Sequence, residues 1–420
     1  MKKTLFLLLT LLSCPPLARA ACEPGVYGSG ASAFVVLVPV PGSGAGLRYL
    51  FLDGRRGMTS DADSPVACSG DQVRVGADDG KPAIWPRIAL RETDTAFDSV
   101  DTRLSGRLIG PTGDTTLPLV VMVHGSERTS ALASPYAYAL AAQGMRVFAY
   151  DKRGTGKSEG EYTQNFELLA ADAAAALAHA RTMAQGRIMR SGYYGGSQGG
   201  WVAPLAAVRA PADFVAVGFG LVASPIDEDR DQMLQEARAA GLGAEAIARI
   251  ERLSQVTAGL LASQFTQGFD DLAALREEFR RHGWLDRIDG EYSGAILRTD
   301  NETLRRLGRA RFDNLELAWD YDAAAVLRQL RTPLLWVLAA QDREAPIEAT
   351  RRTLLSLAQA GKPIDLYVFP DTDHGMFEFT TTAEGERKPT RITDGYLRLL
   401  GDWIKQQAGG SYGRSQRLWP

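Results

Sequence analysis

Cysteine and histidine are scarce in this chain. Its 420 residues include three cysteines and four histidines. The histidines, and the two cysteines that lie beyond the N-terminal segment, show no spacing typical of a metal site. The sequence therefore implies no metal centre.

The chain also lacks an excess of positive charge. It carries 47 Lys and Arg residues against 50 Asp and Glu residues, a formal net charge of −3. Removal of Lys2, Lys3 and Arg19 with the leader described below leaves 44 basic residues and a net charge of about −6. A mildly acidic chain without a basic block is not expected to bind nucleic acid.

No apolar run is long enough to cross a membrane, so we expect no stable membrane insertion. The short run Leu5–Leu12 is typical of a signal peptide, because a basic start precedes it and the small-x-small cleavage signal Ala18-Arg19-Ala20 follows it. We expect cleavage after Ala20 and a periplasmic or secreted protein. Cys14 gives a loose likeness to a lipoprotein processing box, but the two prolines directly after it make lipidation the lesser alternative.

Cys22 and Cys68 remain after cleavage. In an oxidising compartment, a disulfide between them would close a loop of about 45 residues and stabilise the fold by roughly 3–4 kcal/mol. Two free thiols are the alternative, and the sequence leaves both open.

The rest of the chain begins with a β-rich region and continues as alternating strands and helices. Residues 22–95 contain short apolar runs separated by Gly, Pro and Asp, which predicts a small antiparallel β domain. Residues 93–109 alternate as a strand does. After them, apolar runs such as Leu117–Val123 alternate with helical stretches such as Phe166–Ala184, which predicts a parallel sheet covered by helices.

A charged segment of amphipathic helices interrupts this alternation, and we interpret it as a cap inserted between two strands of the sheet. The sheet resumes at Pro333–Leu338 and Ile364–Phe369. The expected division is a signal peptide at 1–20, a β-rich domain at 21–95, the first part of the sheet domain at 96–226, the cap at 227–311, the second part of the sheet domain at 312–407 and a flexible tail at 408–420.

Three serines fit the Gly-x-Ser-x-Gly pattern of a nucleophile elbow, namely Ser158, Ser197 and Ser411. In such an elbow, small residues two positions before and after the serine allow a sharp turn that exposes its hydroxyl. Ser411 lies in the tail with no Asp or His after it, and Ser158 lies several residues beyond its strand. Only Ser197 comes directly between a predicted strand and a predicted helix, so we predict it as the nucleophile.

A serine hydroxyl needs a base, because it is weakly nucleophilic at neutral pH. His374 follows the last predicted strand, at the carboxyl edge where active sites of open α/β sheets lie, and is our candidate. His179 falls inside a helix, His282 ends a cap helix, and His124 lies in a loop upstream of the serine. Structural roles account for these three.

The imidazole in turn needs an orienting carboxylate. Asp342 comes soonest after the strand at 333–338 and is our choice, with Glu344 as its competitor. Asp371 and Asp373 lie beside His374 in sequence. So local a pair would point away from the Nδ1 atom of the imidazole.

These motifs resemble those of the α/β-hydrolase superfamily. The order Ser197, Asp342, His374 is the order of that fold. Three loops also resemble the family's: Asp151–Ser158 its D-x-R-G-x-G-x-S loop, His124-Gly125-Ser126 its H-G-x oxyanion loop, and residues 339–346 its acid loop, with Ala339 and Ala345 as departures. Residues 120–207 are similar to exported bacterial hydrolases grouped with esterases and dipeptidyl-peptidase-like enzymes.

The resemblance implies an α/β-hydrolase fold, with a mostly parallel sheet flanked by helices, and acyl transfer with no metal or organic cofactor. Ser197 would attack an ester-type carbonyl while His374 takes its proton and Asp342 holds the imidazolium. The backbone N–H groups of Gln198 and Ser126 would stabilise the oxyanion.

Three functions stay open. The first is an exported carboxylesterase that acts on a small-molecule ester. The second is a serine peptidase of the aminopeptidase or dipeptidyl-peptidase kind, which would need carboxylates, such as Glu127 or those of the cap, to bind the terminus of a short peptide. The third is a non-catalytic binding protein on the same fold, against which the complete set of Ser, Asp and His argues. The sequence indicates no oligomeric state.

Overall fold

The computed structural model describes residues 22–40, 46–76, 81–313 and 316–419. The predicted signal peptide, residues 1–20, lies outside the described residues. Among the helices within the described ranges, none is both long and apolar enough to cross a membrane.

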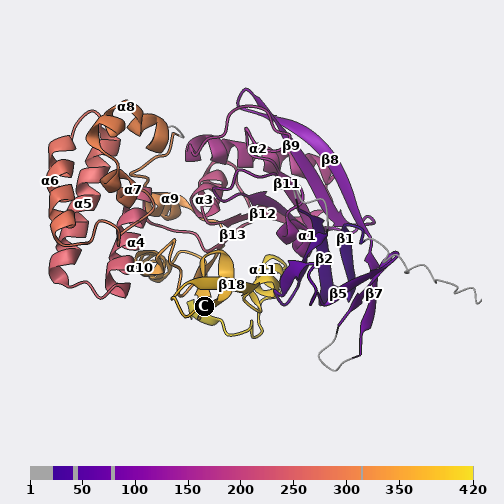
Figure 1. The fold of residues 1–420 in the computed structure, drawn as a ribbon. Coiled ribbons are helices and arrows are strands. Elements are labelled where there is room, and N and C mark those ends of the chain that lie inside the picture. Colours follow the sequence, from indigo (N-terminus) through magenta and orange to yellow (C-terminus); the bar gives the residue numbers. More distant parts are fainter. Residues whose placement is uncertain (1–21, 41–45, 77–80, 314–315, 420) are drawn as a thin grey trace, which may run out of the picture.

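A large sheet forms the centre of the molecule (Figure 1). Its strands are β8 (Leu90–Ser99), β9 (Thr102–Pro111), β10 (Leu117–Val123), β11 (Arg146–Tyr150), β12 (Ile188–Gly196), β13 (Phe214–Gly218), β14 (Leu334–Ala339), β15 (Ile364–Phe369) and β19 (Gln416–Trp419). Their order is β19-β15-β14-β13-β12-β10-β11-β9-β8. Strands β10 to β15 pair in parallel, and β8, β9 and β19 add antiparallel edges. The expected mostly parallel sheet is therefore confirmed.

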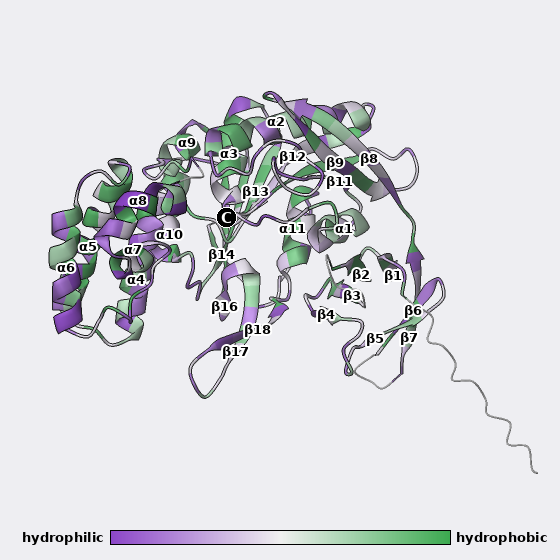
Figure 2. Cartoon of the chain, turned by 45° about the horizontal axis from the view of Figure 1, so that its top comes forward, coloured by the Kyte–Doolittle hydropathy of each residue, from purple (hydrophilic) through white to green (hydrophobic). Residues whose placement is uncertain are grey.

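Apolar side chains hold this sheet between two layers. Strand β10 is apolar and buried along nearly its whole length, as expected for a strand covered on both faces. One face packs against α2 (Phe166–Met183), α3 (Gly199–Arg209), α9 (Ala323–Gln329) and α10 (Ile347–Gln359). The other face packs against α1 (Pro135–Ala142), α11 (Tyr396–Ile404) and the N-terminal domain. Figure 2 shows hydrophobic residues concentrated in these central strands and helices.

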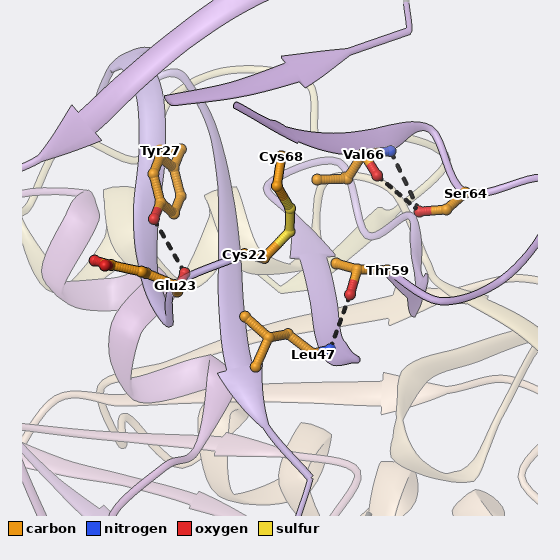
Figure 3. The surroundings of a disulfide bond; sticks show 8 residues. All are labelled: Cys22, Glu23, Tyr27, Leu47, Thr59, Ser64, Val66 and Cys68. Carbon is orange, nitrogen blue, oxygen red and sulfur yellow. Dashed lines mark hydrogen bonds between the residues drawn. A yellow bond between two sulfur atoms is a disulfide. The ribbon is translucent and has the colours of Figure 1, made fainter. Parts of the chain in front are cut away.

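The N-terminal domain is a separate antiparallel sheet. Its strands are β1 (Gly25–Gly30), β2 (Ala33–Pro39), β3 (Leu47–Phe51), β4 (Arg56–Met58), β5 (Val66–Ser69), β6 (Gln72–Val75) and β7 (Ala83–Ile88), in the order β4-β3-β2-β1-β7-β6-β5. Cys22 and Cys68 form a disulfide, with their Cα atoms 5.0 Å apart (Figure 3). The bond joins the start of the domain to β5, so the pairing that the sequence left open is present in the structure.

The boundary of this domain differs from the expected residue 95. Strand β8 already starts at Leu90, and it pairs with β9 in the large sheet rather than with the N-terminal strands. Residues 93–109 are also not one strand. Val100 and Asp101 take positive φ angles of 37° and 55° and turn the chain into the β8–β9 hairpin.

The insertion is helical, as expected. It contains α4 (Pro225–Ala239), α5 (Ala244–Ala262), α6 (Phe269–Arg281), α7 (Ser293–Arg298) and α8 (Asn301–Phe312). These helices share an apolar cluster of their own, which includes Met233, Ile250, Leu272 and Phe279. Figure 1 shows them as a unit to one side of the large sheet.

The end of the chain contradicts the expected flexible tail at 408–420. Strand β19 adds to the sheet edge next to β15. Leu418 and Trp419 pack against the core, Arg417 pairs with Asp365, and Tyr412 is buried. These contacts come from distant parts of the chain, which is why the composition of the tail did not predict them.

A small sheet that the sequence did not predict follows β15. It consists of β16 (Thr372–Asp373), β17 (Phe377–Thr381) and β18 (Arg387–Ile392), in the order β16-β17-β18. A short 3₁₀ turn at His374–Met376 lies between the first two strands. The loop that carries His374 is therefore part of a hydrogen-bonded unit.

Candidate active site

Ser197 lies on a sharp turn between β12 and α3. Its φ angle is 52°, a conformation that is unfavourable for a residue with a side chain. The backbone N–H of Ser197 donates to the carbonyl of Gly218 at 3.1 Å, which holds the turn against β13. The sheet thus imposes the conformation that lifts this serine out of the strand.

The neighbouring glycines are required by close backbone contacts. A Cβ atom on Gly195 would lie 2.4 Å from the carbonyl oxygen of Gly199. A Cβ atom on Gly199 would lie 2.8 Å from the carbonyl oxygen of Val123. The Gly-x-Ser-x-Gly pattern therefore has a steric basis at Ser197.

The other two serines of that pattern lie in different settings. The hydroxyl of Ser158 donates to the carbonyl of Asp151 at 2.6 Å and accepts from the N–H of Ser105 at 2.9 Å, so it closes a loop. Ser411 follows α11 near the end of the chain, and its carbonyl accepts from Arg398. Neither serine has the strand-turn-helix surroundings of Ser197.

The structure brings Ser197, His374 and Asp342 together in one hydrogen-bonded chain. The Nε2 atom of His374 lies 3.1 Å from Oγ of Ser197. The Nδ1 atom of His374 lies 2.9 Å from Oδ2 of Asp342. This is the relation of nucleophile, base and orienting acid that acyl transfer requires.

Asp342 follows β14 and is almost completely buried. Its Oδ1 atom accepts from the N–H groups of Glu344 and Ala345 at 3.1 and 2.7 Å, which leaves Oδ2 directed at His374. Burial raises the pKa of this carboxyl, and the hydrogen bond from His374 opposes that rise. From the cap, Nε2 of Gln235 donates to the carbonyl of Asp342 at 3.1 Å.

The competing carboxylates lie elsewhere around the imidazole. Glu344 approaches Nε2 of His374 at 3.7 Å and not Nδ1. Asp373 accepts from its neighbouring backbone and pairs with Arg387 at 2.7 Å, while Asp371 pairs with Arg414. Only Asp342, among the acids weighed from the sequence, contacts Nδ1.

The electrostatics of His374 favour its protonated form. Burial lowers the pKa of His374, but the hydrogen bond and charge of Asp342, with the charges of Glu344 and Asp373, outweigh burial and raise the pKa above the usual 6.5. The ring of Phe219 packs edge-on against the imidazole, with centroids 5.2 Å apart. A base in this setting is stabilised once it has taken a proton.

The other histidines have structural contacts. His179 pairs with the hydroxyl of Thr95 at 2.9 Å and stacks on Phe97. His282 stacks on Trp284 at the end of α6. His124 lies in the loop after β10, with Nδ1 at 3.6 Å from Glu127.

The two predicted oxyanion donors belong to chain segments beside Ser197. Gln198 directly follows the serine, and the residue before Ser126 is Gly125, where a Cβ atom would lie 3.5 Å from Cβ of Ser197. Within the described residues, neither the Gln198 nor the Ser126 backbone N–H donates to a protein acceptor. Both groups are therefore left available at the elbow.

The sequence offered cap carboxylates only in general terms, and the structure brings two of them, Glu228 and Glu291, near Glu344 on the loop after β14. Glu228 on α4 has a pKa well above its usual value, because it is buried and because Glu291 and Glu344 repel its charge. Burial and the charge of Glu344 also raise the pKa of Glu291, and the charge of His374 partly opposes that rise. The hydroxyl of Tyr292 is buried nearby without a hydrogen-bond partner in the described chain. In the sequence, Glu228 looks like any other charge on a helix surface, so its position near these carboxylates could not be predicted.

No group of three or more His, Cys, Asp or Glu side chains in the described ranges is arranged to hold a metal ion. The acidic side chains above His374 thus do not form a recognisable metal-ligand set.

The chain is similar to known proteins in sequence and in fold. The sequence profile of the serine aminopeptidase S33 family matches residues 115–283. Over 93 residues, the chain is 33% identical to the quorum-quenching protein AidA of Acinetobacter baumannii, which covers 21% of this chain and 31% of that protein. The match thus spans less than one third of the relative's length.

Solved structures with similar folds include esterases and a peptidase. An esterase of Pyrococcus furiosus aligns with a TM-score of 0.45 and 15% identity, over 77% of this chain and 93% of the other. Brefeldin A esterase aligns with a TM-score of 0.44 and 19% identity, over 69% and 70%. Proline iminopeptidase of Mycobacterium smegmatis aligns with a TM-score of 0.44 and 19% identity, over 75% and 98%.

Proposed function

We propose that the chain is a serine hydrolase of the α/β-hydrolase superfamily whose first substrate class is carboxylic esters; the match of residues 115–283 to the serine aminopeptidase S33 family supports this. The observation that carries the proposal is the continuous hydrogen-bonded chain from Ser197 through His374 to Asp342. A binding protein on the same fold has no need of this arrangement.

In the proposed reaction, Oγ of Ser197 attacks the ester carbonyl and Nε2 of His374 takes the hydroxyl proton. The imidazolium gives that proton to the leaving alcohol as the C–O bond breaks, and an acyl-enzyme remains. Water then attacks the acyl group with His374 again as base, which releases the acid and restores Ser197. The Gln198 and Ser126 N–H groups stabilise the oxyanion in both steps, a contribution of about 3–4 kcal/mol per donor in other enzymes.

Hydrolysis of p-nitrophenyl acetate and butyrate tests this proposal. We expect turnover by the wild type that Ser197→Ala abolishes while the melting temperature stays within a few degrees. Turnover that is equal in the two proteins would exclude Ser197 as the nucleophile.

A serine aminopeptidase is the second candidate, and the carboxylates near His374 favour it. Glu228, Glu291 and Glu344 repel one another, and a substrate ammonium group placed among them would relieve that repulsion. The sequence also offered Glu127 for this role, but Glu127 pairs with His124 within the loop after β10. Aminoacyl p-nitroanilides, compared with N-acetylated aminoacyl p-nitroanilides, test this candidate, because acetylation removes the positive charge.

We further propose that the protein is exported, with cleavage after Ala20. The basic start, apolar run and cleavage signal of residues 1–20 support this, as does the disulfide near the expected mature N-terminus. N-terminal sequencing of the protein from a periplasmic or medium fraction should begin at Ala21. An intact Met1 in a purely cytoplasmic fraction would contradict export.

A further inference from the structure

Lys152 is a buried lysine that the proposed reaction has not used. It follows β11 in the loop Asp151–Ser158, and only 4% of its surface is exposed. Its Nζ atom donates to the carbonyl oxygen of Gly125 at 2.7 Å. Gly125 is the residue whose Cβ position lies 3.5 Å from Cβ of Ser197, so the lysine contacts the loop that faces the nucleophile.

The contact acts on one particular peptide group. The Gly125 carbonyl and the Ser126 N–H belong to the same amide, and no described peptide bond is cis. In a trans amide these two groups point in opposite directions. An ammonium group that holds the oxygen therefore fixes the direction of the N–H. By drawing electron density toward the oxygen, it also makes the N–H a stronger donor.

The surroundings of Lys152 hold the loop in this position. The hydroxyl of Tyr162 donates to the carbonyl of Ser126 at 2.6 Å, which fixes the next peptide as well. Nζ of Lys152 and the guanidinium of Arg128 lie 4.9 and 4.3 Å from the centre of the Tyr162 ring. Glu127 is the opposite charge that faces the lysine.

We propose that Lys152 is a positioning residue that aims and polarises the Gly125–Ser126 peptide, so that the Ser126 N–H stabilises the oxyanion. This inference rests on the proposed serine-hydrolase function. It assigns a charged side chain to the oxyanion site, which otherwise contains only backbone groups.

The pKa of Lys152 should make this role depend on pH. Burial and the charge of Arg128 lower that pKa, and the charge of Glu127 raises it. Burial lowers the pKa of Lys152 to about 8, since the attraction of Glu127 only partly compensates. Loss of the ammonium proton near that pH removes the polarising charge but leaves a weaker donor. The groups that face Lys152 and set this value are Glu127, Arg128 and Tyr162, with His124 beside Glu127.

The test compares Lys152→Met, Lys152→Gln and Lys152→Arg in the full-length mature protein. Met removes donor and charge, Gln keeps a donor without the charge, and Arg keeps both. Lys157→Met is the matched control, because Lys157 is exposed on the same loop. Measurements are kcat and KM for a p-nitrophenyl ester, the inhibition constant of a trifluoromethyl ketone, and the melting temperature.

We expect Lys152→Met to lower kcat by about 10- to 100-fold with KM nearly unchanged, below the roughly 10²- to 10³-fold loss seen when an oxyanion donor is removed outright. The ketone, which forms an oxyanion on Ser197, should bind more weakly by a similar factor. Lys152→Arg should retain most of the activity, Lys152→Gln should fall between, and Lys157→Met should match the wild type. Wild-type kcat/KM should decline on the alkaline side near pH 8, and Lys152→Arg should move that decline to higher pH.

Full kcat in a folded Lys152→Met variant would overturn the inference. So would equal losses in kcat for Arg, Gln and Met, because these would reflect disturbed packing alone. If Lys152→Met does not fold, an alkaline decline that is identical in the wild type and Lys152→Arg overturns the proposal by itself. A wild type without ester turnover or labelling by a fluorophosphonate refutes the proposed function, and the inference with it.

Discussion

The large sheet and the helical cap differ in how their carboxylates are paired. In the sheet, apolar strands surround the site, and Asp342 is buried with each oxygen hydrogen-bonded. In the cap, burial and then repulsion by neighbouring carboxylates raise the pKa values of Glu228 and Glu291, and Tyr292 has a buried hydroxyl without a partner in the described residues. Buried polar atoms without a partner occur on both sides within the described residues, since Nε2 of His124 and Oε1 of Gln198 also lack one. The difference lies in the carboxylates: Asp342 on the sheet side is fully hydrogen-bonded, whereas those on the cap side repel one another.

This difference separates chemistry from selectivity. Changes in the sheet should alter kcat for every substrate, because they affect the reacting atoms. Changes in the cap should alter KM for some substrates only. The N-terminal domain provides a third region, since its disulfide belongs to a separate sheet that packs against α1.

The largest expected effect is that of Asp342→Asn. The amide disturbs the tautomer and removes the charge that stabilises the imidazolium, so kcat should fall by about 10⁴-fold. Glu344→Gln is the matched control, because Glu344 approaches Nε2 instead of Nδ1. Its kcat should fall by less than about 10-fold in the same ester assay. A larger loss for Glu344→Gln than for Asp342→Asn would show that the acid is misassigned.

The cap should show a smaller and selective effect. Glu291→Gln and Glu228→Gln should raise KM for an aminoacyl p-nitroanilide by about 10-fold, as expected for the loss of a charge-assisted hydrogen bond. KM for p-nitrophenyl acetate should change by less than about 2-fold. Glu302→Gln, an exposed carboxylate on α8, is the control and should change neither value. Equal rises for the charged and the neutral substrate would remove the argument for an ammonium site.

The pH dependence of kcat/KM connects the two regions. Neutral His374 is the active base, and its pKa is raised, so activity should be lost as the pH falls through a value above 6.5. Glu344→Gln removes one of the charges that raise this pKa and should move the acid limb to lower pH by about half a unit. Steady-state rates from pH 5 to 8 measure the shift. A limb that moves to higher pH would contradict the assigned electrostatics.

The smallest effect on catalysis should come from the N-terminal domain. Loss of the Cys22–Cys68 bond in the double Ser variant should lower the free energy of unfolding by about 4 kcal/mol, given the sequence separation of 46 residues. Ester kcat should stay within about 2-fold, because neither cysteine contacts the site. Denaturant unfolding and the ester assay together make the comparison. A large loss of kcat in a folded variant would mean that the domain supports the site directly.

Much of the large sheet was predictable because its strands are continuous apolar runs. The meeting of Ser197, Asp342 and His374 also followed from the sequence, since each comes just after a predicted parallel strand and such loops share one edge of the sheet. Local pattern is sufficient where burial on both faces dictates the residue type.

The misses have two causes: one turn contains no glycine, and the other features depend on distant contacts. The turn at Val100 and Asp101 contains no glycine, so the sequence does not indicate its positive φ angles. Strand β19 exists because β15 offers an open edge, and its short sequence alone resembles a tail. The carboxylate of Glu228 looks like an ordinary helix-surface charge, and only the packing of α4 against the loop after β14 brings it near Asp342 and Glu344.

The central claim is that Ser197 is the nucleophile of a hydrolase site, and covalent labelling tests it most directly. A fluorophosphonate probe should label the wild-type protein at one site, and mass spectrometry of the digested protein should place the adduct on Ser197. Ser197→Ala should remain folded and take up no probe. An adduct on Ser158 or any other residue, or undiminished labelling of Ser197→Ala, would contradict the claim.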